Sequence, residues 1–338
     1  MKVLIAGLGS IGQRHARNLR TLLGDQVELL AFRVRRESPV IALDLSAKAG
    51  DPEAEYGIRS FDDLGDALGE EPDAVFVTNP AAMHMPVALA AARAGCHLFV
   101  EKPLSHSEEG VEELARTVEE RGVVCLIGYQ LRFHPGFRLL AKLLEERAVG
   151  TVLAAHFDFG EHLAGWHPWE DYRQGTGARA DLGGGVVLAQ IHDLDLAYAL
   201  FGVPLRVFAA GGKRSGLELD VEDTADILLD CEGVSVHLHQ DLLQRPATRL
   251  YQVIGEDGKI VWDYYAQSLA LFRPDGTVET TSFDGFARNQ LFLDELTHFL
   301  ACMEGGERPL VGVREAADSL RIALAARSSL ESGESVAL

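Results

Sequence analysis

Residues 3–12 read VLIAGLGSIG, a short apolar run followed by three spaced glycines. A continuous apolar run of this kind is typical of a strand buried on both faces of a sheet, and residues 11–23 have the spacing of a helix. Between a strand and a helix, Gly7 makes the tight turn, Gly9 lets the backbone approach a pyrophosphate, and Gly12 lets the helix pack closely on the strand. The helix N-terminus then offers N–H groups and a partial positive charge to the anion. The predicted dinucleotide contacts are Gly7, Gly9, Ser10, Ile11 and Gly12; the alternative is a glycine turn with a structural role only.

Strand-like and helix-like segments alternate over the first third of the chain. The predicted strands are 3–6, 27–32, 74–77, 97–100 and 123–127, and the predicted helices are 11–23, 84–94 and 107–121. Alternating strands and helices favour a parallel sheet covered by helices on both faces. We therefore expect an α/β fold that begins with a Rossmann dinucleotide-binding domain over residues 1–125.

The pattern changes after residue 128. The predicted strands are 151–159, 205–210, 225–231, 234–240, 249–254 and 259–263, with tight-turn sequences at 232–233, 256–258 and 274–276. Strands joined by hairpin turns form antiparallel sheets. Apolar helices are expected at 186–201, 289–303 and 313–330. Residues 126–338 are thus predicted to form an α+β substrate and oligomerisation domain with an open, mainly antiparallel sheet and helices on one face.

Composition and charge limit the function further. The chain has 338 residues, of which 47% are hydrophobic and 24% charged, as expected for two globular domains. Its formal net charge of −20 disfavours nucleic acid and anionic membranes as partners, since both require a basic surface. The four cysteines form no CxxC pair, which indicates a reducing compartment and no structural zinc. The N-terminal apolar run is too short for a signal peptide, so we expect a cytoplasmic protein without a bound metal.

The end of the second predicted strand is where the cofactor type is normally selected. An acidic side chain there binds the ribose 2′-hydroxyl of NAD, whereas this chain has Arg33, Arg35 and Arg36. A guanidinium offers a planar fork of donors that suits a 2′-phosphate. The sequence therefore predicts NAD(P) binding with NADP favoured, through Arg33 and Arg35. In the alternative, Arg35 and Arg36 are solvated and Glu37 binds the ribose hydroxyl.

Polar residues follow two further predicted strands, at the sheet edge where open α/β folds bind ligands. Thr78 and Asn79 follow the strand at 74–77, and His84 begins the next helix. These three are predicted to lie at the cofactor, although His84 also suits a packing role at a helix start.

Glu101-Lys102-Pro103 follows the strand at 97–100. Beside a bound dinucleotide, the Lys102 ammonium can hydrogen-bond the reacting oxygen, or act as acid or base if burial lowers its pKa. Glu101 and Lys102 are predicted cofactor contacts and Lys102 a catalytic residue, and Pro103 permits a cis peptide bond. The alternative for the charged pair is a loop ion pair.

A second polar group lies in the predicted helix at 186–201, which follows Gly183-Gly184-Gly185. His192 and Asp195 share one helix face, so Asp195 is expected to orient the imidazole while His192 transfers the alcohol proton. The alternative is a structural pair that ties the helix to the sheet. The loop at 166–173 holds Trp166, Trp169 and Tyr172, which suit either sugar stacking or a domain interface. The acidic run at 218–223 is interpreted as a solvated face without a metal.

Together these motifs resemble the Gfo/Idh/MocA family, which includes glucose-fructose oxidoreductase and inositol 2-dehydrogenase. The markers are the glycine turn, Thr78-Asn79 with His84, Ala94-Gly95-Cys96-His97 leading into Glu101-Lys102-Pro103, and Gly183-Gly184-Gly185 before His192. The stretches 128–135 and 166–173 look like those of sugar-modifying members. The resemblance implies a Rossmann domain, then a domain whose open sheet often mediates oligomers, with Lys102 near the nicotinamide and His192 as acid/base.

The implied activity is hydride transfer between a nicotinamide and a secondary hydroxyl or keto group of a sugar, polyol or sugar derivative. The implied substrate contacts are Tyr129, Arg132, Trp166, Trp169, Tyr172 and His192, and the implied assembly is a homodimer or homotetramer. The family usually has an Asp one turn before the histidine, where this chain has Ala189, or Leu188 in a shifted register. Alanine cannot bind a sugar hydroxyl, so two alternatives stay open: a non-catalytic dinucleotide-binding regulator and an NAD-dependent glycoside hydrolase.

Overall fold

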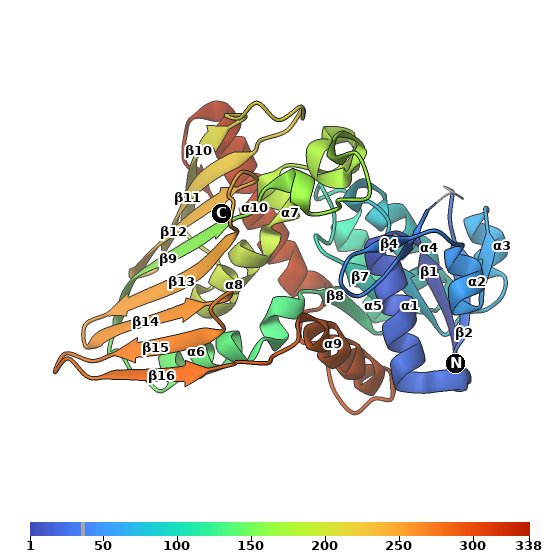
Figure 1. Cartoon of the computed structure of the whole chain (residues 1–338), viewed down its shortest axis with the longest axis horizontal. Coiled ribbons are helices and arrows are strands. Elements are labelled where there is room, and N and C mark those ends of the chain that lie inside the picture. The colour runs from blue at the N-terminus through green and yellow to red at the C-terminus, as the bar shows by residue number, and fades with distance from the viewer. Residues whose placement is uncertain (35–37) are drawn as a thin grey trace. The chain divides into compact units, whose positions relative to one another are not determined.

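The computed structural model describes residues 1–34 and 38–338, which form two compact units (Figure 1). The first unit contains residues 1–129 and 288–317, and the second contains residues 130–287 and 318–338. The sequence places all of 126–338 in one domain, whereas 288–317 belong to the first compact unit. This segment belongs to the first unit because helix α9 (Arg288–Met303) packs on the first sheet. Its apolar residues Leu296 and Phe299 are part of that core.

The sheet of the first unit is parallel throughout, with the described strands in the order β5-β2-β1-β6-β7-β8. Its strands are β1 (Lys2–Ala6), β2 (Glu28–Phe32), β5 (Ile58–Phe61), β6 (Ala74–Val77), β7 (His97–Glu101) and β8 (Cys125–Gly128). Residues 3–6 are wholly buried, as their continuous apolar run predicts. The predicted Rossmann-like domain is confirmed. Strand β5 was not predicted, because its sequence IRSF has no apolar periodicity.

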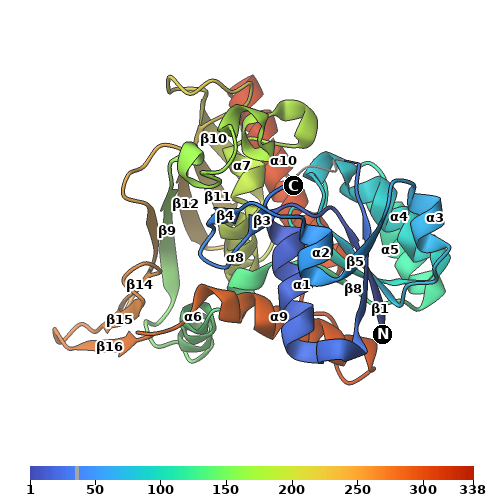
Figure 2. The same ribbon diagram turned by 45° about the vertical axis from the view of Figure 1, so that its right-hand side comes forward.

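Helices cover both faces of this sheet, with α1 and α9 on one face and α4 and α5 on the other (Figure 2). The helices of this unit include α1 (Ser10–Leu23), α2 (Pro52–Tyr56), α3 (Leu64–Leu68), α4 (His84–Ala94) and α5 (Val111–Arg121). Two short strands, β3 (Val40–Ile41) and β4 (Ala47–Lys48), form a separate ribbon. The Phe76 and Phe99 rings stack at 4.9 Å, and both meet Phe299 of α9 edge-on.

The second unit contains a sheet with the described strands in the order β16-β15-β14-β13-β9-β12-β11-β10-β17. Its strands are β9 (Val152–Gly160), β10 (Arg206–Gly212), β11 (Thr224–Cys231), β12 (Val234–Asp241), β13 (Thr248–Gly255), β14 (Gly258–Asp263), β15 (Ser268–Phe272), β16 (Val278–Ser282) and β17 (Val336–Ala337). Only the pair of β9 and β12 is parallel among these described neighbours. The predicted mainly antiparallel sheet is confirmed, although β15 and β16 were not among the predicted strands.

Helices α6 (Pro135–Glu145), α7 (Val186–Ala189) and α8 (Ile191–Phe201) lie on one face of this sheet (Figure 1). The last helix is α10 (Val313–Ser332). Burial alternates residue by residue along β11, so that one side of the strand faces the core and the other faces solvent. Within the described ranges, no helix combines the length and apolar character needed to cross a bilayer.

The continuous helix predicted over 186–201 is wrong at one position. The helix breaks at Gln190, whose φ of −110° and ψ of 32° separate α7 from α8. The Gln190 carbonyl accepts a hydrogen bond from Gln240 Nε2 of β12 at 2.7 Å. Ala189 and His192 therefore do not lie on one regular helix.

Candidate functional site

The glycine turn between β1 and α1 has the close approach that its sequence predicts. Gly7 has a φ of +111°, which favours glycine. A Cβ at Gly12 would collide with the carbonyl oxygen of Gly7, so Gly12 is required for the helix to begin this close to the strand. A Cβ at Gly9 would meet nothing within 4 Å among the described residues.

The N-terminus of α1 is suited to bind an external anion. Its N-cap is Gly9, which offers no side-chain acceptor, and the first turn holds no acidic residue. The first N–H groups of a helix have no partner within the helix, and the helix dipole favours negative charge there. Ser10 and Ile11 begin this helix. The open space above Gly9 and the uncapped helix end fit a dinucleotide pyrophosphate.

Alanine substitutions in the glycine turn are expected to separate binding from folding. Gly9 has an extended backbone (φ −71°, ψ −168°) that any residue adopts, so Gly9→Ala should leave the melting temperature nearly unchanged. Its methyl group would fill the space that the pyrophosphate needs, which should weaken NADH binding about tenfold or more, or about 1.4 kcal/mol. Thermal melting and a fluorescence titration measure the two effects. Gly12→Ala is the comparison variant, which should lose stability; equal NADH affinity for Gly9→Ala and wild type would contradict this assignment.

The end of β6 is tied to the glycine turn and to the loop after β7. Thr78 Oγ1 donates to the Gly7 carbonyl at 2.7 Å. Both ring nitrogens of His84 lie 2.8 Å from backbone carbonyls, those of Pro103 and Asn79. His84 is 1% exposed, and burial lowers its pKa. These contacts support the packing role for His84, since both nitrogens face the protein backbone.

Asn79 has a buried acceptor that fits a cofactor hydroxyl. Its Nδ2 donates to the Met83 carbonyl at 3.3 Å. Its Oδ1 is buried and has no hydrogen-bond partner among the residues the structure describes. A buried amide oxygen without a donor is costly, and a ribose hydroxyl would supply the missing hydrogen bond.

Of the arginines predicted to read the cofactor, the structure describes only Arg33. Its guanidinium is buried, 3.1 Å from Glu53 Oε1 and 3.0 Å from Ser38 Oγ. Arg33 therefore ties the end of β2 to the start of α2. Arg35, together with Arg36 and Glu37, lies outside the described residues.

Lys102 follows the last residue of β7, at the same sheet edge as the glycine turn, because β1, β6 and β7 are parallel. The Lys102–Pro103 peptide bond is cis, as the sequence allows. The adjacent Glu101 carboxyl contacts helix α1: its Oε1 lies 2.8 Å from His15 Nε2, and both side chains are buried. Sequence reasoning missed His15, although its position three residues after Gly12 places it on the same side of α1.

Glu295 of α9 is a buried carboxyl in the core of the first unit. It is 0% exposed, and neither oxygen has a hydrogen-bond partner among the described residues. Burial, with Glu101 as the second cause, raises the pKa of Glu295 well above its usual value of 4.5. Both effects favour the neutral, protonated form of the Glu295 carboxyl.

Replacing Glu295 by glutamine is expected to increase the free energy of unfolding by an amount that depends on pH. Since the folded-state pKa of Glu295 is raised, its contribution to stability is intact below pH 4.5 and declines as pH rises above that value. The decline is about 1.4 kcal/mol per pH unit while the folded acid stays protonated. Glu295→Gln is neutral at every pH, so its free energy of unfolding should exceed that of wild type by an amount that grows with pH. Urea unfolding at about pH 5, 6, 7 and 8 measures this; a difference independent of pH would contradict it.

In the second unit, His192 lies near the start of α8 and is 4% exposed. Its Nε2 is 3.2 Å from the side-chain nitrogen of Gln130, which is also buried. The predicted pairing of His192 with Asp195 differs from the structure. Asp195 binds Arg132 through both oxygens, at 2.7 and 2.8 Å, and accepts from Ser319 Oγ at 2.9 Å. Asp195 shares a helix face with His192, but its carboxyl oxygens are bound by Arg132 and Ser319.

The neighbouring Asp193 belongs to a buried network that the sequence reading missed. Tyr251 donates to Asp193 at 2.6 Å, and burial raises the pKa of Tyr251, so its hydroxyl stays a donor. Arg249 lies 3.4 Å from Asp193, donates to Gln190 Oε1 at 2.8 Å and covers the Phe159 ring at 4.4 Å. This network fixes the start of α8 on strand β13. Its members are about 60 residues apart in the sequence, so no local pattern reveals it.

The glycines at 183–185 allow close approach within the protein. A Cβ at Gly184 would collide with the Thr176 carbonyl, and one at Gly185 would collide with the Glu222 carboxyl. Glu222 Oε1 in turn accepts from Val187 N at the start of α7, and burial raises its pKa.

The interpretation of 218–223 as a solvated face is wrong for part of the run. Asp223 is 0% exposed and accepts from the backbone of Arg214 and Ser215. Asp220 accepts from Ala180 N, and the exposed Glu218 pairs with Arg173. Within the described ranges, no group of three or more His, Cys, Asp or Glu side chains is placed to hold a metal.

The aromatic residues predicted to bind substrate are distributed over both units. Tyr129, directly after β8, is 1% exposed. Trp166 packs beside Gly177, and the rings of Trp169 and His167 lie 5.0 Å apart. The Tyr172 hydroxyl accepts from Glu218 N at 3.1 Å. These contacts order the loop at 161–185, and none of them tests a substrate role.

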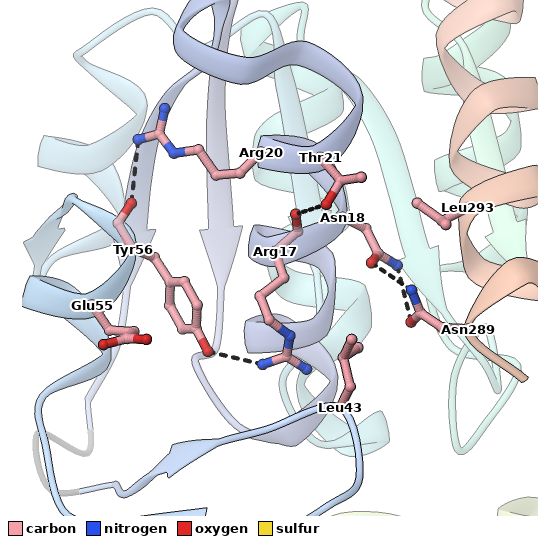
Figure 3. A pocket seen from close by; sticks show the side chains of 9 residues that line it. All are labelled: Arg17, Asn18, Arg20, Thr21, Leu43, Glu55, Tyr56, Asn289 and Leu293. Atoms are coloured by element: carbon pink, nitrogen blue, oxygen red, sulfur yellow. Dashed lines mark hydrogen bonds between the residues drawn. The ribbon is translucent and has the colours of Figure 1, made fainter. Parts of the chain in front are cut away.

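A pocket of about 470 Å³ lies on the first unit, on the C-terminal half of α1 (Figure 3). Its polar side chains are bonded to one another: Arg17 to the Tyr56 hydroxyl at 2.8 Å, and Asn289 to Asn18 at 2.9 Å. None of the predicted cofactor contacts lines it. This pocket is distinct from the glycine turn.

Both halves of the chain match models of known protein families. Residues 1–129 match a family model described as "Oxidoreductase family, NAD-binding Rossmann fold", and residues 137–261 match the "GFO/IDH/MocA C-terminal domain". The chain belongs to the Gfo/Idh/MocA family. The resemblance seen in the sequence motifs is thereby confirmed, and with it an NAD-binding Rossmann fold and an oxidoreductase family.

Individual members of the Gfo/Idh/MocA family resemble the chain over most of its length. It is 24% identical to scyllo-inositol 2-dehydrogenase (NAD(+)) of Bacillus subtilis over 100% of this chain and 96% of that enzyme. It is 30% identical to dTDP-3,4-didehydro-2,6-dideoxy-alpha-D-glucose 3-reductase of Streptomyces violaceoruber over 72% of each. The WlbA dehydrogenase of Bordetella pertussis, solved with NADH and UDP-GlcNAcA, has the same fold with a TM-score of 0.82 at 21% identity, over 100% of this chain and 98% of that one.

Proposed function

We propose that this Gfo/Idh/MocA protein oxidises or reduces a secondary hydroxyl or keto group of a sugar, polyol or sugar derivative. The proposal rests on one observation: the glycine turn and Lys102 both lie at the carboxyl edge of the parallel sheet. A dinucleotide held at the N-terminus of α1 lies at the edge where β7 ends. The relatives, which act on inositols and nucleotide sugars, support the substrate class.

The roles of the residues follow from their chemistry. A bound dinucleotide supplies a nicotinamide that accepts or releases a hydride. Lys102 donates a hydrogen bond to the reacting oxygen, and His192 takes or returns its proton. Gly7, Gly9, Ser10, Ile11 and Gly12 hold the pyrophosphate, and Asn79 accepts from a ribose hydroxyl. Tyr129, Arg132, Trp166, Trp169 and Tyr172 remain the proposed substrate contacts, and Arg132 is held in place by its ion pair with Asp195.

The preference between the two dinucleotides rests on the segment after β2. The pairing of Arg33 with Glu53 means that a 2′-phosphate would compete with a carboxylate for Arg33. The proposed preference for NADP over NAD therefore depends mainly on Arg35.

We also propose a cytoplasmic homodimer or homotetramer. The dispersed cysteines support this location; Cys96, Cys125, Cys231 and Cys302 are free thiols and buried. The sheet of the second unit supports the assembly, since one face carries no helix of the described residues (Figure 1).

A substrate screen tests the proposed function. Purified protein is incubated with NAD⁺ or NADP⁺ and a panel of inositols, aldoses and nucleotide sugars, and the absorbance of reduced nicotinamide is followed. Turnover of a panel member, slowed when the reacting carbon carries deuterium, is the expected result. Tight cofactor binding without turnover in either direction would support the regulatory alternative instead.

A further inference from the structure

The carboxyl end of β7 is held by a buried pair that the proposed chemistry does not use. His15 of α1 is 0% exposed, and its Nε2 lies 2.8 Å from Glu101 Oε1. The imidazole is enclosed by the Phe76 and Phe99 rings, with centroids at 5.4 and 4.8 Å. The two aromatic rings restrict the imidazole, and its hydrogen bond in turn restricts the Glu101 carboxyl.

The Glu101 carboxyl is fixed at its second oxygen as well. Glu101 Oε2 accepts from the backbone N of Lys102 at 3.3 Å. The absence of a side chain at Gly128 leaves room for it, since a Cβ there would lie 3.3 Å from Oε2. One carboxyl thus connects the helix that begins at the glycine turn with the backbone of Lys102.

The charges around the pair favour this arrangement. Arg14 of α1 is close enough to Glu101 for an attractive interaction. Arg288 of α9 is close enough to Arg14 to repel it. His84 of α4 also interacts with Glu101. Glu295 of α9 also interacts with Glu101, and burial together with that carboxyl raises the pKa of Glu295, which favours its neutral form.

We propose that His15 is a positioning residue, which acts through Glu101 to hold the backbone of Lys102 and thereby places the lysine ammonium beside the bound nicotinamide. This inference rests on the proposed function. A displacement of about 1 Å in a reacting group costs about 10²-fold in rate. Loss of the His15 hydrogen bond should therefore impair Lys102 more than it impairs binding at the glycine turn.

The test measures how well NADH protects Lys102 from an amine reagent. Full-length protein is labelled with trinitrobenzenesulfonate with and without saturating NADH, and the peptide that holds Lys102 is quantified by mass spectrometry. The variants are His15→Met, which removes the donor, and His15→Gln, whose amide can donate from the place of Nε2. His97→Met is the matched control, because it makes the same change at the opposite end of β7. Fluorescence titration gives each NADH affinity.

The proposal expects about tenfold protection in wild type, His15→Gln and His97→Met, and about twofold or less in His15→Met at an NADH affinity within about threefold of wild type. Unchanged protection in His15→Met would overturn it, as would a parallel loss of NADH affinity in both His15 variants. If His15→Met does not fold, Glu101→Gln replaces it, since the amide cannot accept at both oxygen positions. Wild type that binds no NADH refutes the proposed function itself, and wild type that binds NADH without protection refutes the placement of Lys102.

Discussion

Lys102→Ala is expected to lower kcat about 10²–10⁴-fold on any substrate that the wild type turns over, the range of a positioned proton donor or acceptor. The substitution removes the only ammonium of the Glu101-Lys102-Pro103 segment, at the sheet edge shared with the glycine turn. NADH affinity should fall by less than about tenfold, or 1.4 kcal/mol, because the pyrophosphate site at α1 is intact. Steady-state kinetics together with a fluorescence titration separate the two effects.

Lys142→Ala is the matched control for that variant. Lys142 is an exposed lysine of α6 with a surface ion pair to Glu146, and such pairs contribute about 0–1 kcal/mol. Its kcat should equal that of wild type. A Lys102→Ala enzyme that keeps full kcat would contradict the assignment of Lys102, whatever its NADH affinity.

His192→Asn is expected to cost about 10²–10⁴-fold in kcat, because an amide cannot exchange a proton at neutral pH. The variant should stay folded, because asparagine is smaller than the buried histidine. In addition, the hydrogen bonds of the network from Asp193 to Arg249 hold the start of α8 in place. A pH–rate profile measures the second consequence: the limb that reports the histidine should disappear in the variant.

The control for His192 is His156→Asn, which alters an exposed histidine on β9. Its pH–rate profile should match that of wild type. If His192→Asn retained both its rate and the wild-type profile, another group would have to transfer the proton.

The elements that the sequence predicted are those determined by local patterns. The conformation of residues 3–12 is determined by these ten residues themselves. A Cβ at Gly12, for example, would collide with the Gly7 carbonyl, so the turn between strand and helix can be predicted locally. The family markers added the family itself and the proposed roles of Lys102 and His192. Strand β5 was missed because IRSF carries no period that distinguishes it from a loop.

The features that the sequence did not predict depend on partners far along the chain. At the break, the Gln190 carbonyl accepts a hydrogen bond from Gln240, which is 50 residues away, and Asp195 binds Arg132 from 63 residues away. The His15–Glu101 pair spans 86 residues. An i, i+3 spacing such as that of His192 and Asp195 shows only that two side chains share a helix face; it does not show that they bind each other.

Parallel fluorescence titrations of the purified protein with NADH and NADPH test the central claim most directly. The account predicts saturable binding in the micromolar range, about −8 kcal/mol, with NADPH bound more tightly. Tighter binding of NADH would refute the preference assigned to the arginines after β2 and leave the oxidoreductase intact. Binding of neither dinucleotide, by protein that carries no cofactor from purification, would contradict the account.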